Sequence, residues 1–123
     1  MKIEIFATTG SPLYSGEHES LSEAVSAAVR AGTKLTGAKL TGADLRWADL
    51  RAANLARADL HEAKLTGASL GGANLDGAKL IGANLRGADL WVANLARADL
   101  WTAKLQGANL WGANLAGSGT EKL

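Results

Sequence analysis

Apolar residues recur every five positions through most of the chain. From Leu35 to Leu115 every fifth residue is leucine, 17 in succession, and from Ala38 to Ala113 every fifth residue is alanine, 16 in succession. A step of five turns an α-helix by about 500°, so these leucines would be spread around the whole helix. In a straight strand the same step would send successive leucines to opposite faces. Neither a helix nor a flat strand can bury this pattern on one side.

A short extended piece followed by a corner does satisfy the spacing. Alanine and leucine lie two residues apart, which places both side chains on one face of an extended segment. The second residue after leucine is glycine at 10 of the 17 positions, and the residue before leucine is aspartate, asparagine, lysine or serine. Both groups of residues favour tight turns, because glycine accepts unusual backbone angles and asparagine and aspartate bond to nearby backbone. The pattern predicts a solenoid whose coils stack as parallel strands about 4.8 Å apart around a leucine core.

The outward residues favour four corners per coil over three. With four corners, residues 20 apart become vertical neighbours, and one column is then all asparagine: Asn54, Asn74, Asn94 and Asn114. A second column alternates in charge: Lys39, Asp59, Lys79 and Asp99. With three corners Asn54 would lie below Ser69, and neither column would survive. The leucines expected in the core of one wall are Leu35, Leu55, Leu75, Leu95 and Leu115.

Residues 1–32 lack the five-residue period and are predicted to form a hairpin and a helix. KIEIF alternates as a strand does, TTGSP has turn chemistry, and PLYSG fits a return strand. In SLSEAVSAAVRAG, Ser20 and Glu23 form a capping box and Gly32 supplies a stop. A bare solenoid end would expose leucines and unpaired strand edges, so we expect the hairpin and helix to cover the first coil. The expected domains are therefore a cap at 1–32, a solenoid at 33–118 and a polar tail at 119–123.

The repeated units resemble those of the pentapeptide repeat proteins. GADLR, AANLA, RADLH, GANLD and GANLW follow the form Ala-(Asp/Asn)-Leu-x-x, and the resemblance extends roughly over residues 33 to 118. It implies an all-β solenoid, a right-handed quadrilateral parallel β-helix of about four coils, here with a small N-terminal β-hairpin and α-helix as a cap. The N-terminal segment also resembles segments that precede the repeats in bacterial and phage members of the family. The chain departs from the commonest family pattern by its lysines at positions 34, 39, 64, 79 and 104.

Tryptophans gather near the C-terminal end of the repeat. Trp91 and Trp111 are 20 apart and are expected to be vertical neighbours, whereas Trp101 falls on the opposite wall. Together with Leu115 they form the candidate interface, because a twofold dimer would bury two such ends against each other. The alternative is that these rings only cover neighbouring glycine and leucine. For Trp47, which stands alone in the first coil, covering the backbone is the expected role.

Composition and spacing argue against an enzyme. The chain has no cysteine, and its two histidines, His18 and His61, lie in no metal-ligand or nucleophile spacing. We expect His61 and Glu62 to be a solvated pair, and Asp44 and Asp49 to face solvent from adjacent walls. The glycine-rich piece GASLGGAN does not lead from a strand into a helix, so it is not a phosphate loop.

The first residues lack the apolar region of a signal peptide, and no run approaches the roughly 18 apolar residues needed to cross a membrane. We therefore expect a cytoplasmic protein without catalytic residues, cofactor, metal or small-molecule substrate.

Two functions remain. The first is a scaffold for an unknown protein partner, self-associating as a homodimer through the C-terminal coil. The second, implied by the family resemblance, is modulation of DNA gyrase or topoisomerase by imitation of B-form DNA. Residues 33–118 contain seven acids and ten bases, whereas a DNA mimic should be strongly negative, so charge favours the scaffold. Direct phosphate contact by Arg46, Arg51 and Arg86 is a third possibility, which so few bases on flat walls support weakly.

Overall fold

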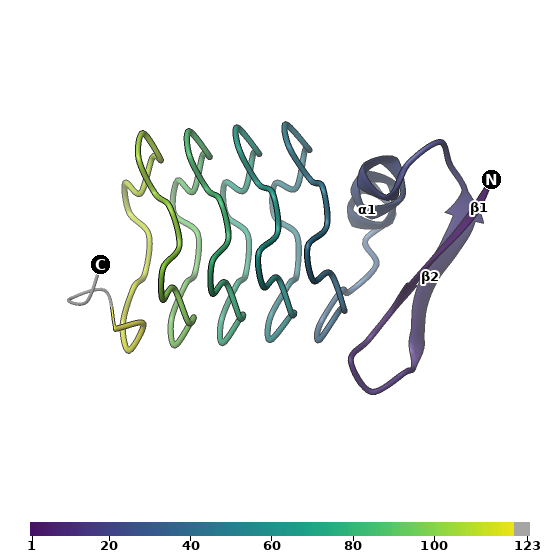
Figure 1. Cartoon of the computed structure of the whole chain (residues 1–123), viewed down its shortest axis with the longest axis horizontal. Helices are drawn as coiled ribbons and strands as arrows, with labels where there is room; N and C mark the ends of the chain where they lie inside the picture. Colours follow the sequence, from purple (N-terminus) through teal and green to yellow (C-terminus); the bar gives the residue numbers. More distant parts are fainter. Residues whose placement is uncertain (120–123) are drawn as a thin grey trace.

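The computed structural model describes residues 1–119 and shows a solenoid with a small cap at one end (Figure 1). Strands β1 (Lys2–Phe6) and β2 (Pro12–Glu17) form an antiparallel hairpin, and helix α1 (Leu21–Arg30) follows. The chain then winds through successive coils away from the cap. The predicted hairpin and helix are thus confirmed, whereas residues 120–123 of the expected polar tail lie outside the described residues.

Helix α1 begins at the predicted cap, with one difference in its hydrogen bonds. The hydroxyl of Ser20 accepts the N–H of Glu23 at 3.1 Å. The carboxylate of Glu23 accepts the N–H of Glu19 at 2.7 Å, one residue before the N–H that a capping box uses. At the other end Gly32 adopts a φ of 77° and takes part in a Schellman motif, so the predicted stop is confirmed.

The cap is joined to the first coil by backbone bonds and by apolar packing. Ala7 forms an antiparallel bridge with Ala38, and the N–H of Lys39 donates to the C=O of Phe6 at 2.7 Å. Helix α1 lies against the end of the solenoid (Figure 1) and contributes buried side chains to the leucine core: Ala24, Val25 and Ala28. Hairpin and helix therefore close this end of the core.

Backbone bridges in the solenoid join residues that are twenty apart. Asn54 pairs in parallel with Asn74, and Asn74 with Asn94. Four five-residue units therefore complete one turn, which is the spacing expected for four corners and excludes three. Four walls run along the solenoid, and each is named by its first leucine: the Leu35, Leu40, Leu45 and Leu50 walls.

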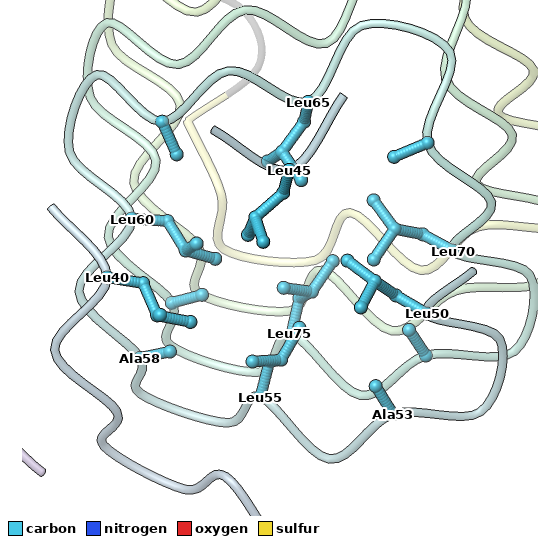
Figure 2. Packing of buried hydrophobic residues seen from close by; sticks show 14 of the residues in the cluster. Leu40, Leu45, Leu50, Ala53, Leu55, Ala58, Leu60, Leu65, Leu70 and Leu75 are labelled. Atoms are coloured by element: carbon cyan, nitrogen blue, oxygen red, sulfur yellow. The ribbon is translucent and has the colours of Figure 1, made fainter. Parts of the chain in front are cut away.

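Leucine and alanine side chains fill the interior. Figure 2 shows leucines of successive coils, such as Leu55 and Leu75, one above the other and directed toward the axis. Four of the five leucines expected in the core of the Leu35 wall are at most 1% exposed: Leu35, Leu55, Leu75 and Leu95. Leu115 is only partly buried, because no further coil packs on it in the described structure.

Each corner places the second residue after leucine in the left-handed region. The C=O of Leu35 accepts the N–H of Ala38 at 3.0 Å, and Gly37 between them has a φ of 69°, as a type II turn requires. Non-glycine residues adopt the same conformation at seven corners, with φ between 50° and 64°: Trp47, Ala52, Arg57, Glu62, Val92, Arg97 and Thr102. The ladder of bonds to the next coil holds these residues, as when the N–H of Trp47 donates to the C=O of Thr66 at 3.0 Å.

The expected polar columns exist, but their side chains bond inside each unit. The Oδ1 of Asn54 accepts the N–H of Ala56 at 3.2 Å, and other asparagines of the column do the same. Lys39 and Asp59 are bridged through their backbones, yet the ion pairs among residues 1–119 involve no lysine. The alternating order of lysine and aspartate along this column is therefore confirmed, and the carboxylate of Asp59 accepts the N–H of His61, two residues on, at 3.2 Å.

Candidate interaction surface

The coil of residues 100–119, termed the C-terminal coil, differs in composition from the coils before it. Lys104 is its only charged residue, whereas residues 40–59 include six: Asp44, Arg46, Asp49, Arg51, Arg57 and Asp59. Three of its four leucines are only partly buried: Leu105, Leu110 and Leu115. Trp101 and Trp111 are 63% and 67% exposed. Loss of charge together with gain of aromatic side chains is the composition found at the centre of protein interfaces.

Two of the three candidate interface tryptophans come together. Trp91 and Trp111 stack on the Leu50 wall with ring centroids 6.0 Å apart and ring planes inclined by 12°. Their predicted vertical contact is therefore confirmed, and both rings remain substantially exposed. Trp101 belongs to the Leu40 wall, across the solenoid from them, and shares no ring contact with either in the described structure.

Trp47 covers the backbone of the next coil, as expected. Its ring lies so close over Gly67 that a Cβ at this glycine would overlap with it. Other corner side chains lean in the same direction: a Cβ at Gly112 would lie 2.8 Å from Cγ1 of Val92. Three corners of the C-terminal coil are glycine, so no side chain projects beyond the coil at these points: Gly107, Gly112 and Gly117.

The carboxylates expected to face solvent on adjacent walls are held by arginines of their own units. Arg46 donates to Asp44 through Nε at 2.8 Å and Nη2 at 2.7 Å, and Arg51 does the same to Asp49. These side-chain bonds, together with the arginine backbone N–H, lower the pKa of each aspartate to about 2. The same bonds raise the pKa of both arginines. Arg46 and Arg51 are therefore less available to a phosphate than the sequence suggests.

Each histidine bonds a side chain close to it in the sequence. His61 lies with Glu62 at an outward corner, as expected, and its Nδ1 contacts Oδ1 of Asp59 at 2.6 Å. Burial would raise the pKa of Asp59, but bonds from the side chain and N–H of His61 and from Thr41 lower it overall. His18 bonds the hydroxyl of Tyr14 at 2.8 Å within the hairpin.

Two broader findings concern residues 1–119. No group of three or more histidine, aspartate or glutamate side chains is arranged to hold a metal ion. The single helix α1 is too short and too polar to cross a membrane.

The repeat units identify the family of the chain. The family profile described as Pentapeptide repeats, in 8 copies, matches residues 31–67, 53–91 and 93–118. This protein belongs to the pentapeptide repeat family. Among solved structures it is similar to the pentapeptide repeat protein Rfr23 of the cyanobacterium Cyanothece 51142, with 39% identity and a TM-score of 0.60 over 62% of this chain and 52% of that one. The solenoid is accordingly a right-handed β-helix.

Two further pentapeptide repeat proteins of known structure share sequence with the chain. HetL of Nostoc sp. strain PCC 7120, which is involved in heterocyst differentiation regulation, is 46% identical over 66% of this chain and 39% of that one, with a TM-score of 0.45. A protein of the Arabidopsis thaliana thylakoid lumen is 36% identical over 65% and 63%, with a TM-score of 0.45. The chain spans less than two thirds of the length of each. No curated protein matches the chain at a significant level.

Proposed function

We propose that this pentapeptide repeat protein is a non-enzymatic scaffold that self-associates through its C-terminal coil. In this proposal about four coils of a quadrilateral β-helix hold that coil at a fixed distance from the N-terminal cap. The observation that carries the proposal is the change in composition at residues 100–119, where a single charged residue remains beside two exposed tryptophans and three half-buried leucines.

The backbone of the C-terminal coil is suited to receiving another layer of strand. In inner coils each leucine N–H donates to the next coil, as that of Leu85 does to the C=O of Lys104 at 2.8 Å. Within residues 1–119 the corresponding N–H groups of the last coil have no backbone acceptor: Leu105, Leu110 and Leu115. A second copy related by a twofold axis would supply apolar contact for these leucines and acceptors for such groups. The glycine corners would let the two backbones approach to strand spacing.

Imitation of DNA finds less support in the arrangement of charge. Arg46 and Arg51 neutralise two aspartates, and Arg97 binds Asp76 at 2.5 Å. The walls consequently offer no continuous row of free carboxylates to a DNA-binding partner. The scaffold is therefore the function that we propose.

Size-exclusion chromatography with light scattering tests the proposal. We expect a molar mass near twice 12.6 kDa for the native chain. The double change Trp101→Ala and Trp111→Ala should weaken the dimer by roughly tenfold or more, since buried aromatic side chains dominate interface energies. Trp47→Ala removes a ring that is 75% exposed on the first coil and should leave the dimer unchanged. A native chain that is monomeric at all accessible concentrations would contradict the proposal, as would a double variant that dimerises normally.

A further inference from the structure

The corner residues, defined as the second residue after each leucine from 37 to 117, follow a rule that the leucine and alanine pattern does not contain. Along each edge of the solenoid, successive corner residues are twenty apart. Arg57 lies between Gly37 and Gly77, and Val92 lies between Gly72 and Gly112. Wherever both corners lie between positions 37 and 117, a corner residue that is not glycine is always followed, one coil later, by a glycine corner.

Steric contact explains the rule, because a corner side chain leans onto the corner of the next coil. Two glycines that follow a long side chain have little room for a Cβ, which would lie 3.2 Å from Cγ of Glu62 at Gly82 and 3.3 Å from Cγ of Arg57 at Gly77, while at Gly117 it would lie 3.4 Å from Cγ of Arg97. At Gly67 and Gly112 the overlap with the preceding side chain is worse. Glycines that follow alanine or glycine have space: a Cβ at Gly72 or Gly87 would meet nothing within 4 Å.

The corner contacts differ between coils, whereas the core residues are the same in every coil. Leucine and alanine occupy identical places in every coil, so the core would accept the coils in any order or number. The corner residues do not allow every order of coils. Residues 52–71 carry Ala52, Arg57 and Glu62 at three of four corners, whereas residues 72–91 carry glycine at all four. Omission of the second segment would place Arg57 below Arg97 and Glu62 below Thr102.

We infer that the corner residues form a stacking code that sets the order in which coils can follow one another. A coil whose corners carry long side chains must be followed by glycine corners, and a coil with glycine corners accepts either kind. The length of the scaffold can therefore change only by segments that obey this order. Duplication of residues 72–91 or of 52–91 obeys it, but duplication of residues 52–71 places Arg57 and Glu62 below their own copies.

Three in-phase tandem duplications test the inference, each inserted directly after the segment that it copies. Thermal unfolding followed by circular dichroism should give midpoints at or above that of the native chain for the 72–91 and 52–91 duplications. The 52–71 duplication should unfold at least about 5 °C lower than the 72–91 duplication, which has the same length and core pattern. Equal midpoints for the two twenty-residue duplications would overturn the inference.

A variant of the 52–71 duplication separates steric contact from other differences. With Arg57→Gly and Glu62→Gly in the inserted copy alone, the midpoint should recover by several degrees. The same two changes in the native chain, without duplication, measure what glycine itself contributes at left-handed corners. A recovery no larger than this intrinsic effect would also overturn the inference.

Discussion

Leu75→Ala is expected to lower the free energy of unfolding by about 2 to 5 kcal/mol. The side chain is 1% exposed and lies next to Leu55 on the Leu35 wall (Figure 2), and backbone bridges from Asn74 hold one coil on each side of it. Its removal leaves a cavity that the closed ladders on either side prevent from collapsing, so lost burial and the cavity both contribute. Urea unfolding with an unchanged m-value would measure the loss.

Leu115→Ala is the matched control on the same wall. Leu115 is only partly buried and has a leucine neighbour on one side alone in the described structure, so we expect its replacement to cost clearly less than that of Leu75. Equal losses at the two positions would show that the interior is not organised as a stack with one half-open end.

Gly67→Ala is expected to destabilise the protein by about 2 to 5 kcal/mol. One part is the left-handed backbone, which costs a residue with a Cβ about 1 to 2 kcal/mol. The other is overlap of the new methyl group with the ring of Trp47, in the range of about 1 to 3 kcal/mol for overpacking. The change would be measured by chemical denaturation.

Two corners isolate the steric part of this effect. Gly72 and Gly87 share the φ of 67° found at Gly67, but a Cβ at either would meet nothing within 4 Å. Alanine at these positions should cost the backbone contribution alone. Trp47→Ala should in turn remove most of the excess cost of Gly67→Ala in a double-mutant cycle. If Gly67→Ala behaved as Gly72→Ala does, the lean of Trp47 onto the next coil would be disproved.

The five-residue period predicted the core because burial alone imposes it. Leucine and alanine two apart must share a face, and only a corner after each pair lets that face stay inside. The helix of the N-terminal cap was equally predictable, since Ser20 and Gly32 are residue types that favour the start and the end of a helix. These features depend on local pattern, which a single sequence contains.

The side-chain bonds outside the core were harder to predict. Asp59 forms a hydrogen bond with His61 of its own unit and not an ion pair with a lysine of an adjacent coil. The corner brings residues two apart to within hydrogen-bond distance. The left-handed angles of Trp47 and Arg57 could not be read from residue type, since such residues rarely adopt them. The direction in which these side chains lean became visible only with the coils in place.

The candidate interface could be predicted from the sequence only in part. The twenty-residue spacing of Trp91 and Trp111 predicted their contact correctly. The loss of charge in residues 100–119 was also present in the sequence, but it gained meaning only when the structure assigned those residues to one coil.

The most direct test of the twenty-residue turn, on which every wall and corner depends, is disulfide formation between introduced cysteines, since the chain has none of its own. The structure bridges Asn74 to Asn94, so the pair Asn74→Cys and Asn94→Cys should lie about 4.8 Å apart and oxidise readily. The pair Asn74→Cys and Asp89→Cys, fifteen apart, should remain reduced, because its members lie on different walls. Ready oxidation of the second pair and not of the first would contradict the account.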